Sequence, residues 1–108
     1  MVAIDSGSDW SSSLVDDELI VVLGGEIDAA NAETLTRRLH LECEQIRAER
    51  VILDVGGVTF IDSTGLAMLI TTSRALDGSG TELVLRSPSA LLRKLIDITG
   101  IGSLFTIE

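Results

Sequence analysis

Two adjacent hydroxyl groups, Ser63 and Thr64, stand in the stretch VTFIDSTGL at 58–66, where one apolar run stops and another begins. This pattern is typical of a strand that ends and a helix that starts. A hydroxyl at such a junction can be a nucleophile, a phosphate-binding group, the acceptor of a phosphoryl group, or a helix cap. The rest of the sequence narrows these four roles.

The partners that a catalytic serine needs are missing from the sequence. A serine hydrolase uses a G-x-S-x-G turn and a histidine base, but Ile61 replaces the first glycine and the only histidine, His40, falls on the polar side of a predicted helix. A P-loop needs G-x-x-x-x-G-K-[ST], and the single lysine, Lys94, belongs to another helix. One cysteine, Cys43, and one histidine make no metal-ligand cluster. The sequence therefore favours a protein that is not an enzyme and needs no cofactor.

Two roles remain open for Ser63. As a helix cap, a serine accepts hydrogen bonds from free backbone N–H groups and contributes about 1 kcal/mol. As a modified residue, a phosphoserine adds about −1.5 to −2 charge, which the dipole of a helix N-terminus tolerates. A phosphate at this position is expected to leave the fold intact and to change what docks on it.

Composition limits the partners and the compartment. The chain has 108 residues, 8 Lys+Arg and 17 Asp+Glu, so its formal net charge of −9 disfavours nucleic acid as a ligand. A lone cysteine agrees with a reducing compartment. No run of about 18 apolar residues predicts a membrane span, and the N-terminus lacks the pattern of a signal peptide. We expect a cytoplasmic protein without direct membrane contact.

Four apolar strands alternate with three amphipathic helices along the chain. This order predicts an α/β domain with a largely parallel sheet, which a short strand near 11–15 can extend. Residues 1–13 are polar and serine-rich, which indicates a mobile lead-in before a domain at 14–108. The strands are expected at 19–23, 51–55, 82–86 and 104–107, and the apolar faces of the three helices begin at Ala32, Leu66 and Leu91.

Several residues are predicted to set the ends and faces of these elements. Asp28 or Asn31 can cap the first helix, and Ser87 with Pro88 can start the third. Gly56 and Gly57 are expected to turn the chain after 51–55. The apolar helix faces are Ala32, Leu35, Leu39, Cys43 and Ile46; Leu66, Leu69, Ile70, Ser73 and Leu76; and Leu91, Leu92, Leu95 and Ile96.

The loops GGEIDAAN and DSTG follow the carboxyl ends of two of these strands, where function gathers in such sheets. Four motifs in this order resemble the anti-sigma factor antagonists, the single-domain branch of the STAS superfamily. The motifs are GGEID at 24–28, VILDVGGVTFIDSTGLAML at 51–69, GTELVLRSP at 80–88 and LIDITGIGSLF at 95–105. The resemblance implies the STAS fold, a central mixed, mostly parallel β-sheet of four to five strands with helices packed against it. Members of the family usually continue into a further helix after the last strand, whereas this sequence ends at Glu108.

The resemblance also implies a switch. The unphosphorylated form would bind an anti-sigma factor that is also a serine kinase, and so release the sigma factor. Phosphorylation of Ser63, or less favourably Thr64, would end that binding, and a metal-dependent serine phosphatase would restore it. Together with the residues around this serine, the resemblance leads us to expect partner binding at Asp28, Asp62, Ser63, Thr64, Gly65, Ala67 and Met68.

The residues themselves add two expectations to the resemblance. Asp28 and Asp62 are expected to flank Ser63, so that a phosphate would add charge to a negative region. Ala67, Met68 and Thr71 are expected to form an exposed docking face on the second helix, although Met68 can instead pack at the helix edge. An alternative function stays open: a STAS subunit of a lipid ABC transporter, a constitutive structural partner, is also compatible with DSTGLA at 62–67.

Overall fold

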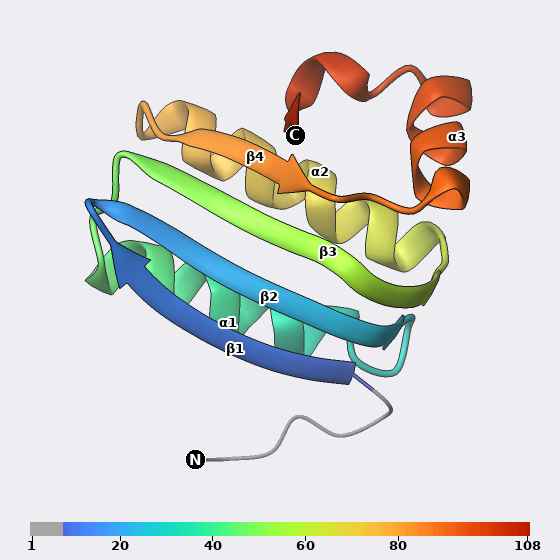
Figure 1. The fold of residues 1–108 in the computed structure, drawn as a ribbon, viewed down its shortest axis with the longest axis horizontal. Coiled ribbons are helices and arrows are strands. Elements are labelled where there is room, and N and C mark those ends of the chain that lie inside the picture. The colour runs from blue at the N-terminus through green and yellow to red at the C-terminus, as the bar shows by residue number, and fades with distance from the viewer. Residues whose placement is uncertain (1–7) are drawn as a thin grey trace.

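A five-stranded sheet forms the centre of the molecule, and its strands lie side by side in the order of the sequence (Figure 1). The computed structural model describes residues 8–108. β1 pairs with β2 antiparallel, and the other neighbours pair parallel. This confirms the predicted α/β class and mixed, mostly parallel sheet. The elements are β1 (Ser8–Val15), β2 (Glu18–Ile27), α1 (Ala32–Gln45), β3 (Arg50–Ile61), α2 (Ser63–Gly78), β4 (Glu82–Arg86), α3 (Ala90–Thr99), the 3-10 helix η1 (Gly102–Leu104) and β5 (Thr106–Ile107).

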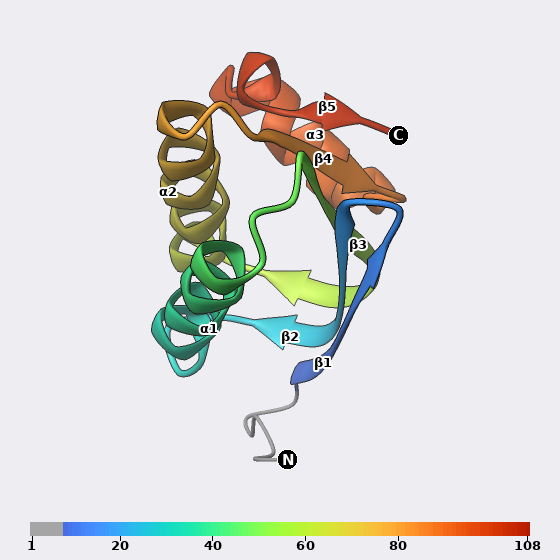
Figure 2. The same ribbon diagram turned by 90° about the vertical axis from the view of Figure 1, so that its left-hand side faces the viewer.

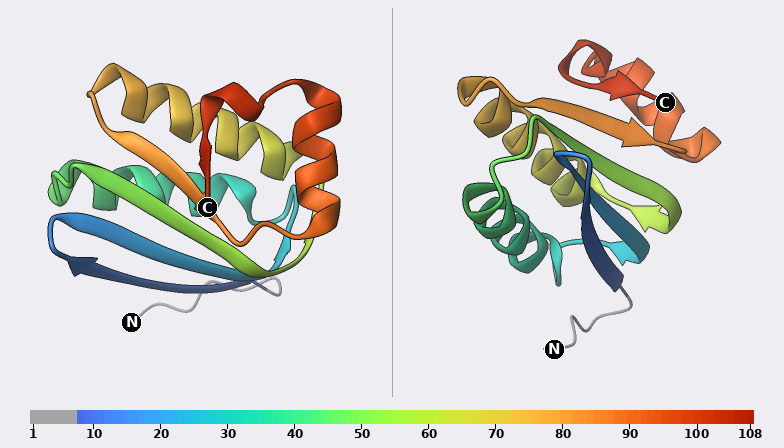
Figure 3. Two further views of the ribbon diagram at one scale, coloured as in Figure 1. Left: turned by 45° about the horizontal axis from the view of Figure 1, so that its top comes forward. Right: turned by 60° about the vertical axis from the view of Figure 1, so that its left-hand side comes forward.

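Helices α1 and α2 cover one face of the sheet (Figure 2). Alternate residues of the central strands point toward them, as a strand period of two requires. α3 stands apart from this pair, at the end of the sheet where β4 finishes (Figure 3). The buried core includes Leu19, Val21, Leu23, Leu35, Leu39, Val51, Leu53, Val55, Leu69, Leu83 and Leu85.

The N-terminal boundary differs from the predicted lead-in. Strand β1 begins at Ser8, so residues 8–13 belong to the sheet, while residues 1–7 lie outside the described part of the chain. Trp10 pairs with Leu23 of β2, and its ring lies 4.7 Å from the Arg38 guanidinium of α1. Cross-strand pairing and this cation–π contact give a serine-rich segment partners that its composition does not reveal.

Strand β3 does not turn at Gly56 and Gly57 as predicted. It continues to Ile61, and the register between β2 and β3 shifts between Val22 and Gly24 and again between Gly25 and Glu26. A Cβ atom on Gly57 would lie 3.4 Å from Gly24 Cα, which is ordinary van der Waals contact, so the two backbones lie close together here without a clash. The shift allows both strands to extend together until Ile27 pairs with Ile61.

The third helix starts two residues later than predicted. Ser89 caps α3, because its Oγ accepts a hydrogen bond from the Leu92 amide at 3.1 Å. Ser87 instead has a positive φ of 57° in the preceding turn. Leu92 and Ile96 face the core, whereas Leu91 is 56% exposed, so the predicted apolar face is wrong at that position.

Candidate functional site

The carboxyl ends of β2 and β3 meet at one edge of the sheet. The Asp62 amide donates a hydrogen bond to the Ile27 carbonyl at 3.2 Å, directly beyond the Ile27–Ile61 pair. Parallel neighbours end on the same side, so the loop after β2 and the start of α2 lie together. The two predicted loops therefore form one surface.

Asp62 is the N-cap of α2, so Ser63 does not fill the cap role that the sequence left open for it. One oxygen of its carboxylate, Oδ1, accepts hydrogen bonds from the Thr64 amide at 2.9 Å, the Gly65 amide at 3.1 Å and the Thr64 hydroxyl at 2.5 Å. The Ala29 amide is a further donor to this carboxylate. These bonds, the one from the Thr64 hydroxyl foremost, lower the pKa of Asp62.

The two candidate acceptors differ in their hydrogen bonding. Ser63 is the first residue of α2 and is exposed, and its hydroxyl has no hydrogen-bond partner among residues 8–108. Thr64 is also exposed, but its hydroxyl donates to Asp62. Of these two residues, only Ser63 has a hydroxyl without a hydrogen-bond partner in the described part of the chain.

Gly65 holds the start of α2 against the strand ends. A Cβ atom at this position would lie 2.4 Å from Ile61 Cγ1 and 3.0 Å from Ile27 Cγ2. Contacts under 3.0 Å do not occur for real Cβ atoms, so only glycine lets the helix backbone rest on these two isoleucines. Gly65 is buried, so it positions the site but is not accessible to a partner.

The loop after β2 is fixed by its own hydrogen bonds. The Asp28 carboxylate accepts from the Ala30 amide at 2.9 Å, and the Asp28 carbonyl accepts from the amides of Asn31 and Ala32. Asn31 occupies the N-cap position of α1, but its side chain bonds to the backbone of Glu26 and Asp28. Because Ile27 and Ala29 both bond to Asp62, Asp28 lies beside that residue, and two carboxylates border the start of α2.

The exposed face of α2 starts at Ser63. Ala67 and Thr71 follow at spacings of four and are exposed, so the three residues lie on one side of the helix. Met68 is 3% exposed and belongs to the core. The predicted docking role of its side chain is therefore wrong, because one step along a helix turns about 100° and carries Met68 to the buried side.

One neighbouring side chain was not predicted from the sequence. Phe60 is 47% exposed, two residues before Asp62. Strict alternation along β3 would put Phe60 on the same side of the sheet as the buried Val58. Instead Thr59 and Phe60 are both exposed and Ile61 is buried. The irregular register at this end of the strand breaks the period on which a sequence prediction depends.

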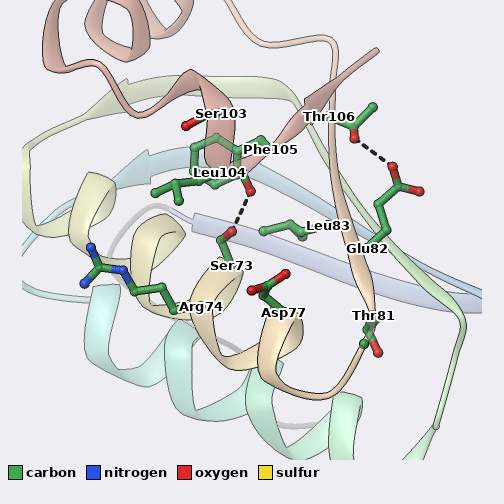
Figure 4. Close-up of a pocket in the computed structure, with 11 residues that line it drawn as sticks. Ser73, Arg74, Asp77, Thr81, Glu82, Leu83, Ser103, Leu104, Phe105 and Thr106 are labelled. Atoms are coloured by element: carbon green, nitrogen blue, oxygen red, sulfur yellow. Dashed lines mark hydrogen bonds between the residues drawn. The ribbon is translucent and has the colours of Figure 1, made fainter.

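The geometry favours a modifiable hydroxyl over a catalytic one. No group of three or more His, Cys, Asp or Glu residues in the described part of the chain could hold a metal ion. The Asp62 carboxylate is a poor general base, because its bonds favour the ionised form. A cavity of about 460 Å³ lies elsewhere, between the second half of α2, β4 and the η1–β5 segment. There the Ser73 hydroxyl donates to the Leu104 carbonyl (Figure 4), so this cavity lies apart from Ser63.

None of the helices described over 8–108 has the length and apolarity to cross a membrane.

Fold and site together define a single-domain α/β protein with an exposed serine at the start of its second helix. The chain belongs to the STAS domain family, which matches residues 11–108. The anti-sigma-B factor antagonist of Bacillus subtilis is 33% identical over 93 residues, which are 86% of this chain and 84% of that protein. An anti-sigma factor antagonist from Mycobacterium paratuberculosis superposes with a TM-score of 0.78 at 27% identity, covering 99% of this chain and 89% of that one.

The fold also matches the anti-sigma factor antagonist SpoIIAA, whose structure is known in two forms. The unphosphorylated form superposes with a TM-score of 0.78 at 21% identity, covering 93% of this chain and 88% of that one. The phosphorylated form, from Bacillus, gives a TM-score of 0.73 at 21% identity, covering 93% and 91%. At this identity the likeness concerns the fold alone.

Proposed function

We propose that this protein is an anti-sigma factor antagonist whose binding is controlled by phosphorylation of Ser63. The observation that carries the proposal is the free, exposed hydroxyl of Ser63 at the start of α2, beside the carboxylates of Asp28 and Asp62. The names of its relatives agree with this function. The protein acts by binding a partner and catalyses no reaction of its own.

The partner is an anti-sigma factor that is also a serine kinase. In the unphosphorylated state, the protein binds this anti-sigma factor, which then releases its sigma factor for transcription. The protein acts in the cytoplasm, and its net charge of −9 leaves direct contact with DNA unfavourable. A metal-dependent serine phosphatase restores the binding form.

The proposed docking surface consists of exposed and half-buried residues around Ser63. Asp28, Asp62 and Thr64 border it on the loop side, and Ala67 continues it along α2. Phe60 adds an exposed aromatic side chain, of the kind that is enriched in protein interfaces. Gly65 and Met68 contribute by positioning the helix, because both are buried.

Phosphorylation switches the surface by charge. A phosphoryl group brings about −1.5 to −2 charge to a position already bordered by two carboxylates. Like charges brought together across an interface cost several kcal/mol. An acidic partner surface that tolerates a neutral serine is therefore repelled by the phosphoserine.

Intact mass after incubation with the cognate kinase and ATP tests this function. We expect the wild-type chain to gain one phosphoryl group, Ser63→Ala to gain none, and Thr64→Val to behave as wild type. A gain that survives Ser63→Ala would contradict the assignment of the site. Absence of any gain, together with stable copurification with a transporter ATPase, would favour the lipid transporter subunit instead.

A further inference from the structure

The hydrogen bonds of Asp62 occupy the backbone N–H groups that a phosphate could otherwise bind at the start of α2. A helix begins with four N–H groups that have no partner within the helix. Here the Asp62 amide donates to the Ile27 carbonyl at 3.2 Å, and the amides of Thr64 and Gly65 donate to the Asp62 carboxylate. Only the Ser63 amide remains of the four. The usual anion-binding groups of a helix N-terminus are thus already occupied by a carboxylate.

Thr64 fixes this carboxylate in place. Its hydroxyl donates to the same Oδ1 atom that accepts the two amides, at 2.5 Å. The hydrogen bond commits the Thr64 proton to Asp62 and holds the carboxylate over the helix end. Ala29 adds a donor from the opposite loop. Displacing Asp62 would break all four bonds at once.

We propose that the Asp62–Thr64 pair closes the N-terminus of α2, so that a phosphoryl group on Ser63 stays in solvent and Ser63 is the only acceptor. Thr64 is then a positioning residue and not a second phosphorylation site. This inference rests on the proposed function for the origin of the phosphate. It goes beyond that function because it states where the phosphate lies and why the neighbouring hydroxyl is passed over.

The transfer itself involves Ser63 and a nucleoside triphosphate held by the kinase. The Ser63 O–H bond breaks and an Oγ–P bond forms. The bond between the γ-phosphorus and its bridging oxygen breaks, the nucleoside diphosphate leaves with that electron pair, and the hydroxyl proton passes to solvent. Thr64 does not react in the same way, because its hydroxyl is turned toward Asp62.

An open helix end would give a different switch. There the phosphate would accept hydrogen bonds from the first amides and act as a new cap, as phosphates do at free helix N-termini. Behind the Asp62–Thr64 pair, the phosphate instead remains a displayed charge beside Asp28 and Asp62. The backbone at the start of α2 is then the same in the unphosphorylated and the phosphorylated protein, for the kinase and the phosphatase alike.

Amide spectra of a chain with phosphoserine encoded at position 63 test the closure without any kinase. In the wild-type background, we expect the amide protons of Thr64 and Gly65 to keep nearly the shifts of the unmodified protein. Asp62→Ala removes the carboxylate, so phosphoserine should move both amide protons downfield. Asp62→Asn is the matched control, since its amide oxygen can still accept both bonds, and it should respond as wild type.

Large downfield shifts of both amide protons in the wild-type background would overturn the closure, because they would place the phosphate on the helix end. Equal responses of Asp62→Ala and Asp62→Asn would overturn it as well.

Mapping of the phosphorylated residue after kinase treatment tests the choice of acceptor. We expect phosphate on Ser63 alone in the wild type and in Asp62→Asn. In Asp62→Ala the Thr64 hydroxyl is released, and we expect part of the phosphate on Thr64. Modification of Thr64 in the wild type, or of Ser63 alone in all three proteins, would contradict this selection. If no variant gains phosphate, the proposed function fails, while the spectra of the encoded phosphoserine still decide the closure.

Discussion

The start of α2 has three neighbouring polar residues with different roles, Asp62, Ser63 and Thr64. The sequence predicted the strand-to-helix junction and an available hydroxyl. It could not decide which residue caps the helix, because Ser, Thr and Asp are all good caps. The backbone decides: Asp62 has extended φ and ψ angles and accepts the amide bonds, whereas Ser63 is already helical. Ser63 is therefore free to be modified.

Asp62→Ala should lower the urea midpoint of unfolding at pH 7, and Asp62→Asn should lower it less, because its amide oxygen can still accept both backbone bonds but carries no charge. The hydrogen bonds hold the pKa of Asp62 below its ordinary value of 3.8. A lowered pKa in the folded state stabilises the fold above that value, and this stabilisation is lost as the pH falls through the folded pKa. The difference between wild type and Asp62→Ala should therefore be complete at pH 7 and shrink below about pH 3.8. A difference that is independent of pH would contradict the role of the ionised cap.

Ser63→Asp should leave the melting temperature nearly unchanged and weaken binding of the anti-sigma factor. The side chain is exposed at the first position of α2, where an acidic residue is tolerated by the helix dipole. Differential scanning calorimetry and a binding titration on the same sample measure the two effects. A large loss of stability would show that the serine has a structural role instead.

At the scale of elements, α2 has one face in the core and another on the proposed docking surface. The sequence period predicted the core positions Leu69, Ser73 and Leu76, which are all buried. It misplaced Met68, since an apolar side chain next to the core stripe can belong to either face. Only the angle at which the helix rests on the sheet settles that position.

Exchanges at Ala67 and Met68 should separate these two faces. Met68→Ala removes a side chain that is 3% exposed and should cost about 2–5 kcal/mol of unfolding free energy. Ala67→Arg places a long side chain on the exposed face and should change stability by less than about 0.5 kcal/mol, while weakening partner binding. Urea unfolding and a binding titration distinguish the two. Equal loss of binding without loss of stability in both would contradict the burial of Met68.

Two glycines of α2 provide a second matched pair. Gly65→Ala would bring Cβ to 2.4 Å from Ile61 Cγ1, whereas Gly78→Ala meets no atom within 4 Å. We expect Gly65→Ala to displace the start of α2, lower the melting temperature and slow phosphorylation of Ser63. Gly78→Ala should be neutral or slightly stabilising, since alanine is the better helix former. Similar effects of both substitutions on melting would contradict the close contact at Gly65.

The strands show where sequence patterns stop being informative. The apolar runs of β2, β3 and β4 predicted the centre of the sheet because buried parallel strands are continuously apolar. Edge strand β1 carries serines at three successive positions, 11–13, and is held by pairing with β2. Long-range pairing of that kind leaves no local pattern, and the same holds for the register shift that lengthens β3.

At the scale of the whole molecule, an acidic chain is stabilised by a few well-placed arginines. Arg50 contacts Glu18 at 2.6 Å, Glu82 at 2.9 Å and Glu108 at 3.6 Å, so it joins β2, β3, β4 and the last residue of the chain. Bonds from Thr106 and Arg50 lower the pKa of Glu82 below its ordinary value of 4.5. This network contributes to stability above that pH and less below it.

Arg50→Gln should therefore lower the melting temperature at pH 7 and reduce its fall on acidification below about pH 4.5. High salt should narrow the difference between the two proteins, because exposed ion pairs are screened. Melting curves between pH 3 and pH 7, at low and high salt, measure both effects. An unchanged acid transition in Arg50→Gln would contradict the role of this network.

The affinity of the anti-sigma factor for the serine and phosphoserine forms of one chain tests the proposed switch most directly. Encoded phosphoserine at position 63 and calorimetric titration make the comparison without a contaminating kinase reaction. We predict that the phosphoserine form binds at least tenfold more weakly, a difference of about 1.4 kcal/mol or more, with its fold unchanged. Equal affinity of the two forms would contradict the conclusion that Ser63 controls binding.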